Sequence, residues 1–131
     1  MKTEIAQLNL VLAWLWILLG FVTGMVLGLF FHRENWLGGY ASLRRRMYRL
    51  GHISFFGLGA VNLFFWLTVK DLVVADSALG VASGAFMVGA ITMPISCAIM
   101  AHFPKAYLIF TVPVLSLIAG GALTLLTIIK L

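Results

Sequence analysis

Four long stretches of this chain contain no charged residue, and they restrict its fold more than any other feature. They comprise residues 8–31, 50–69, 79–101 and 107–129. A helix needs about 20 predominantly apolar residues to cross the hydrocarbon core of a bilayer, and each stretch is long enough to do so. In lipid the backbone has to satisfy its own hydrogen bonds, so each stretch is predicted to be an α-helix. A transmembrane β-barrel would require alternating polarity, which these runs lack.

The overall composition agrees with a membrane protein. Of the 131 residues, 63% are hydrophobic and 10% are charged, and the mean hydropathy is +1.09. Soluble domains carry about 25% charged residues, and small chains bury the smallest fraction of their surface. We therefore predict an all-α integral membrane protein, with residues 1–131 forming a single four-span domain folded as a four-helix transmembrane bundle.

The net charge of +5 and the isoelectric point near 9.9 do not indicate binding to nucleic acid. The positive residues flank hydrophobic spans, where membrane topology and anionic lipid explain them. Six lie on one side of the predicted spans and three on the other. The first group comprises Arg33, Arg44, Arg45, Arg46, Arg49 and Lys105; the second comprises Lys2, Lys70 and Lys130. This bias predicts that the long basic loop is cytoplasmic and that both termini face outward.

The basic loop also contains aromatic residues suited to the headgroup region of a membrane. Trp36, Tyr40 and Tyr48 lie in it, and residues 40–50 are predicted to form a short interfacial helix whose arginines reach lipid phosphates. The small size and the arginine-biased loop favour a bacterial inner (plasma) membrane. The single cysteine, Cys97, lies in a span and is interpreted as a small buried side chain.

Small residues recur at helical spacing and predict close packing between helices. In lipid, helices associate through close contact rather than through hydrophobic burial, and small residues permit that contact. The predicted packing ridges are Gly20, Gly24 and Gly28 in the first span, Gly80 and Gly84 in the third, with Gly89 further along, and Ser116, Gly120 and Thr124 in the fourth; the second offers Gly57 and Gly59.

Polar and proline residues inside the spans predict further contacts. Asn62 lies near the middle of the second span, where an amide requires a partner. We expect it to clamp a neighbouring helix through Thr92, Thr23 or a backbone carbonyl. Pro94 and Pro113 should bend the third and fourth spans, with Ser96 or Thr111 satisfying carbonyls that the prolines leave free.

Three histidines are the candidate ligands of the chain. His32, His52 and His102 should all lie at the predicted cytoplasmic boundary. Imidazole binds haem iron and transition metals, and two histidines from facing helices suit a six-coordinate haem b. His52 is the preferred ligand, His102 its partner, and His32 an alternative ligand or a donor to a haem propionate. Arg44, Arg45, Arg46 and Arg49 are candidate contacts for the propionates or for lipid phosphates.

A metal site would use the same three histidines, with or without Glu34, and the sequence does not identify the metal. A histidine at a helix end is also an ordinary interfacial residue, and it interacts favourably with a helix C-terminus. This second interpretation suits His32 and His102 in particular.

The sequence lacks the patterns of the common enzyme classes. No nucleophile stands beside a base, no carboxylates are paired in the spans, and no phosphate-binding glycine loop occurs. No motif is specific enough to assign a family.

Two hypotheses about function follow from these features. The first is a non-enzymatic accessory or structural subunit, docked through its glycine ridges onto other membrane subunits or onto itself. The second is a small cytochrome-like electron-transfer protein that binds haem b or a metal.

Overall fold

The computed structural model describes residues 2–72 and 77–131, and the side chains of the first helix from Ala6 onward. Its elements are α1 (Lys2–Phe30), η1 (Trp36–Gly38), α2 (Leu43–Val69), α3 (Ser77–His102), η2 (Pro104–Phe110) and α4 (Thr111–Ile129). Four helical segments are long and apolar enough to cross a membrane, namely Ala6–Phe30, Leu43–Val69, Ser77–His102 and Pro104–Ile129. The prediction of an all-helical chain with four candidate spans is therefore confirmed.

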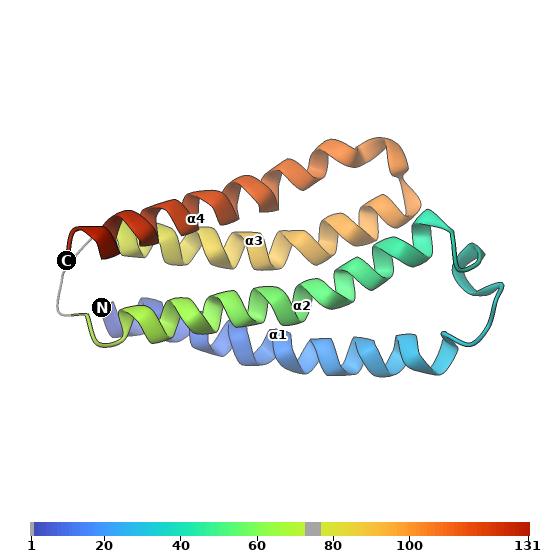
Figure 1. The fold of residues 1–131 in the computed structure, drawn as a ribbon, viewed down its shortest axis with the longest axis horizontal. Coiled ribbons are helices and arrows are strands. Elements are labelled where there is room, and N and C mark those ends of the chain that lie inside the picture. Colours follow the sequence, from blue (N-terminus) through green and yellow to red (C-terminus); the bar gives the residue numbers. More distant parts are fainter. Residues whose placement is uncertain (1, 73–76) are drawn as a thin grey trace.

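The helices run alternately up and down, so the connections gather at two opposite ends (Figure 1). One end holds the end of α1, η1, the start of α2 and the turn from α3 into η2. We name it the basic end because it carries Arg33, Arg44, Arg45, Arg46, Arg49 and Lys105. The other, here the terminal end, holds the chain termini (Figure 1). The side of the membrane that each end faces stays a prediction.

The bundle is open rather than closed. Extensive interfaces join α1 to α2, α2 to α3 and α3 to α4, while a smaller one joins α1 to α3. No comparable interface joins α1 to α4 within the described residues. The ribbons of α1 and α2 diverge toward the basic end (Figure 1). Helices α1, α2 and α3 thus form a three-helix unit, and α4 packs along its α3 edge.

Helix α2 begins at Leu43 rather than near Leu50, so the arginine-rich segment belongs to the span itself. The prediction of a separate interfacial helix over residues 40–50 is wrong. Ser42 explains the early start, because its hydroxyl accepts a hydrogen bond from the Arg45 backbone N–H at 3.1 Å. Just before it the chain turns through Gly38 and Gly39, whose φ angles of 86° and 99° favour glycine.

Each proline in a span removes the N–H that would bond to a carbonyl one turn back, and the two carbonyls find different partners. Pro94 removes the N–H that would bond to the Ala90 carbonyl, and the Trp16 indole N–H on α1 donates to that oxygen at 3.0 Å. Pro113 lies in the first turn of α4, directly after the 3₁₀ helix η2. The Ile109 carbonyl, one turn before it, accepts from the Thr111 backbone N–H. The Ser96 hydroxyl makes its closer bond to the Thr92 carbonyl, at 2.8 Å, and only a long contact of 3.5 Å to Ile109.

Candidate functional site

A buried polar cluster joins the first three helices in the terminal half of the bundle. We name Asn9, Asn62 and Ser83 the polar clamp, and all three are fully buried. The Asn9 amide donates to Asn62 Oδ1 at 2.7 Å and to the Ser83 backbone oxygen at 3.5 Å. The Ser83 hydroxyl donates to Asn9 Oδ1, and the Asn62 amide donates to the Leu58 oxygen at 2.9 Å. Each amide group has a partner, so we interpret the clamp as a structural contact that joins the three helices.

Asn62 does clamp a neighbouring helix, but not through the expected threonines. Thr92 and Thr23 donate to carbonyls one turn back in their own helices, at 2.7 Å in both cases. The partner is Asn9, which sequence reasoning missed. A signal was present, because Asn9, Asn62 and Ser83 lie at similar depths when residues are counted from the terminal end of each helix.

Arg45 is buried at the basic end, with 1% of its surface exposed. Its guanidinium donates to the Phe31 carbonyl and, at 3.1 Å, to the Arg33 carbonyl. It also stacks on the rings of Tyr40 and Phe31, with its Cζ 4.0 and 4.5 Å from the ring centroids. Arg45 therefore holds the chain just beyond α1. Its guanidinium faces these groups rather than the outside, where a propionate or a lipid phosphate would approach.

The other arginines of α2 are exposed. Arg44, Arg46 and Arg49 all point outward, and none forms an ion pair within the described part of the chain. Arg44 Nε donates to the Ala101 carbonyl near the end of α3 at 3.4 Å. Arg49 lies over the Phe31 ring, at 5.6 Å from its centroid. These three side chains remain candidates for binding anions at the basic end.

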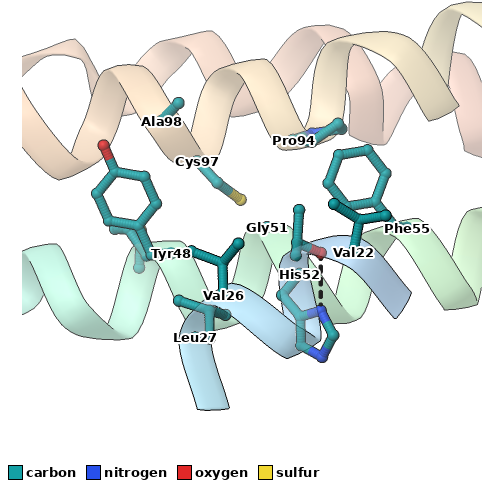
Figure 2. A pocket seen from close by; sticks show the side chains of 12 residues that line it. Val22, Val26, Leu27, Tyr48, Gly51, His52, Phe55, Pro94, Cys97 and Ala98 are labelled. Atoms are coloured by element: carbon teal, nitrogen blue, oxygen red, sulfur yellow. Dashed lines mark hydrogen bonds between the residues drawn. The ribbon is translucent and has the colours of Figure 1, made fainter. Parts of the chain in front are cut away.

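His52 has one nitrogen engaged and one available. Its Nδ1 lies 3.0 Å from the Thr23 hydroxyl, which donates its own proton to the Leu19 carbonyl. If the hydroxyl keeps its bond to Leu19, it accepts from Nδ1–H, and no bond from Nε2 is recorded among the described residues. The ring is turned away from α3 (Figure 2). It lies against Gly24, where a Cβ would come within 2.8 Å of Cε1, so this glycine makes room for the imidazole.

His102 is engaged elsewhere. Its Nε2 lies 2.8 Å from the Tyr48 hydroxyl, across the α2–α3 interface at the basic end. The His52 ring is turned away from α3, the helix that carries His102 (Figure 2). His32 lies just beyond α1 and is exposed, and its backbone oxygen accepts from the Tyr40 hydroxyl at 3.2 Å. The structure thus places all three histidines toward the basic end but gives His52 and His102 different partners.

Among residues 2–72 and 77–131, no group of three or more histidine, cysteine or acidic side chains is placed to hold a metal ion. The expected centre of three histidines with Glu34 is therefore not formed within the described chain. Its members are spread over the end of α1, the third turn of α2 and the end of α3. Haem binding through His52 and His102 stays a prediction.

An apolar pocket of about 350 Å³ opens between α1, α2 and α3 toward the basic end. Figure 2 shows Val22 and Val26 from α1, Tyr48 and Phe55 from α2, and Pro94 and Cys97 from α3 around it, with the Cys97 sulfur pointing into the space. The helices α2 and α3 approach closely here. A Cβ added to Gly51 would lie only 3.4 Å from the Cys97 Cβ. The volume falls at the lower end of the range for small-ligand sites.

Only part of the glycine pattern lies at interfaces within the chain. Gly20 and Gly24 face α2, and Gly120 faces Phe86, whose ring a Cβ would meet at 3.1 Å. Gly28, Gly80 and Gly84 have no atom of a neighbouring element within 4 Å of an ideal Cβ. Gly89 and Gly59, which were also expected to pack, do lie at interfaces: a Cβ would come within 2.6 Å of Leu117 at Gly89 and within 3.1 Å of the Ala13 carbonyl at Gly59, whereas Gly57 has no described atom within 4 Å. The spacing alone does not show which face of a helix meets a neighbour.

Comparison with known proteins adds no assignment. No protein-family model matches the chain, and searches of the curated proteins and of the solved structures likewise gave no match.

Proposed function

We propose that the chain is a non-enzymatic accessory subunit that packs its outer helix faces against other membrane helices. The observation that carries the proposal is the pair Gly80 and Gly84 on α3. The two glycines lie one turn apart on one face, and no atom of the described residues of another element lies within 4 Å of an ideal Cβ on either. A glycine inside a helix costs about 1 kcal/mol relative to alanine, and close helix contact compensates for this in lipid. Within the described chain that contact is not made, which favours a helix from another protein.

The open architecture supports the same proposal. In the most hydrophobic 18-residue window of each candidate span, between 11% and 33% of the residues are buried within the chain. Most of each helix surface is therefore available to lipid or to further helices. Gly28 on α1, at the end of the series that begins with Gly20, likewise has no described atom within 4 Å of an ideal Cβ.

The test is the size of the complex extracted from native membranes in mild detergent. The wild-type chain should migrate on a native gel well above its monomer mass of 14.4 kDa. Gly84→Leu should shift it to the monomer, because the larger side chain blocks close helix approach. Gly121→Leu is the matched control, since Gly121 on α4 also has open space beside it but lies outside the ridge. Wild-type migration as a monomer, or an unchanged complex in Gly84→Leu, would contradict the proposal.

Copies of the chain carrying two different tags distinguish the kinds of partner. Co-purification of the two tags indicates self-association, whereas co-purification of another membrane protein with either tag indicates a larger complex. If each tagged chain purifies without the other tag and without another membrane protein, neither self-association nor a larger complex is supported.

The second candidate function is electron transfer through haem b or a metal bound by His52 alone. The specific observation in its favour is that His52 is contacted at Nδ1 and has no recorded partner at Nε2 within the described chain. The hydrogen bond from Nδ1 to Thr23 orients the ring, as partners of metal-bound histidines commonly do. The ring packs against Gly24, and Gly28, one turn further along α1, has no described atom within 4 Å of an ideal Cβ. The remaining ligand would come from a partner subunit.

A visible spectrum of protein purified after haem-replete expression, together with metal analysis, tests this candidate. A Soret band or bound metal should be present in the wild type and lost in His52→Ala. His102→Ala should retain it, because His102 Nε2 contacts Tyr48 instead. Absence of both signals from the wild-type complex would eliminate the candidate.

A further inference from the structure

We infer that the pocket between α1, α2 and α3 holds one acyl chain of an anionic phospholipid, whose phosphate binds Arg44. The inference is independent of the accessory-subunit proposal and rests on how the pocket continues into the basic end. On α2, Arg44 precedes the lining residues Met47 and Tyr48 by three and four positions, so it lies on the same helix face. On α3, Ala101 stands in the same relation to Cys97 and Ala98.

The two faces meet one turn beyond the pocket. Arg44 Nε donates to the Ala101 carbonyl at 3.4 Å, so the guanidinium lies between the same two helices that line the pocket. Tyr48 and His102 make the adjacent contact at 2.8 Å. An apolar cavity thus ends in a polar rim that carries a positive charge. This order of an apolar interior and a cationic rim matches the order of tail and headgroup in a phospholipid.

The charge of the rim selects the headgroup. Arg44 is exposed and forms no ion pair within the described chain, and its terminal nitrogens can bind two phosphate oxygens together. Arg45, its neighbour, is held by the carbonyls beyond α1 and takes no part. Atoms that line an empty cavity lack dispersion contacts, and an acyl tail in the pocket would supply them. The tail supplies little discrimination, so the choice among lipids lies with Arg44.

The test uses the full chain reconstituted in vesicles of equal phosphatidylglycerol and phosphatidylcholine, released into mild detergent and examined by native mass spectrometry. The wild type should retain one phosphatidylglycerol in preference to phosphatidylcholine. Arg44→Gln should lower that preference about fivefold, the usual effect of one basic residue near an anionic membrane surface. Arg46→Gln is the matched control, since Arg46 is exposed on the same helix but lies on another face.

A second variant tests the tail. Ala98 lines the pocket and is exposed at its edge, so Ala98→Leu should fill the space without disturbing the fold and reduce the retention of both lipids. If Arg44→Gln does not fold, Arg44→Lys keeps the charge without the paired donors and should give an intermediate preference.

Four results would overturn the inference. They are an unchanged lipid ratio in the Arg44 variant, an equal loss in Arg46→Gln, full retention in Ala98→Leu, and displacement of the lipid by millimolar inorganic phosphate. The last would indicate a phosphate site that makes no use of the tail.

Discussion

Individual polar side chains connect the first three helices. The polar clamp and the Trp16–Ala90 bond all lie between helices that are distant in sequence. In a membrane interior such bonds stabilise by about 0.6–2 kcal/mol, with the lower value more usual. Asn9 bonds to the side chains of both Asn62 and Ser83, so its loss removes an inter-helix hydrogen bond from each of them.

Asn9→Ala should therefore lower the stability of the purified protein by about 1–2 kcal/mol, because Asn62 and Ser83 both lose a partner inside the bundle. Thermal unfolding in detergent measures the effect as a lower Tm. Asn35→Ala is the control, since Asn35 is exposed before η1 and its side chain makes no capping bond. Equal Tm values for the two variants would show that the clamp carries no net stability.

The sequence predicted the need for a partner at Asn62 but not the partner's identity. The cost of a lone amide in lipid is a local property, whereas pairing depends on how far each helix slides along its neighbour. Likewise the three histidines were correctly placed toward one end, because helix direction alone determines that. Their side-chain partners, Thr23 and Tyr48, depend on helix rotation, which an apolar run without a polar face does not specify.

At the scale of elements, hydropathy located most ends of the four spans correctly, because a span is expected to end where the apolar run ends. Hydropathy misplaced the start of α2, because the seven arginine-rich residues before Leu50 lower the hydropathy but continue the helix. Ser42 provides the missing signal, as a capping residue followed by a run of good helix formers.

Arg45→Lys should loosen the segment between α1 and α2. A lysine ammonium has no planar fork to span the Phe31 and Arg33 carbonyls and stacks less well on Tyr40. The substitution should lower the free energy of unfolding by about 2 kcal/mol. Chymotrypsin should then cleave the 31–42 segment faster than in the wild type. Arg46→Lys, which alters an exposed arginine, should leave the cleavage rate unchanged. Equal cleavage in all three proteins would refute the holding role of Arg45.

Interface glycines and uncovered glycines should respond differently to the same substitution. Gly59→Ala places a Cβ about 3.1 Å from the Ala13 carbonyl, a backbone atom that yields little, and should destabilise by about 1–3 kcal/mol. Gly80→Ala meets no atom and should be neutral or up to about 1 kcal/mol more stable. Denaturation of the purified variants in detergent measures both. Destabilisation by Gly80→Ala would show that this face is already packed.

For the whole molecule, the arrangement places Arg33 and Lys105 at one end and Lys130 at the other. In a Cys97→Ser background, cysteines at the first two positions should react with an impermeant maleimide from the cytoplasmic side. A cysteine at Lys130 should react from outside, because the arginine bias predicts that the basic end faces the cytoplasm. Labelling of positions 33 and 105 from opposite sides would contradict the four-span arrangement.

The Trp16–Ala90 bond has a consequence for the order in which the chain assembles. The third helix carries a carbonyl that its own backbone leaves unmatched, and the indole that meets it belongs to α1, which is synthesised before α3. Emerging from the ribosome, α3 is therefore an incomplete helix until it finds α1 already in the bilayer. A chain cut between α1 and α2 should still be rescued by supplying the missing helix as a separate peptide, provided that peptide keeps its tryptophan.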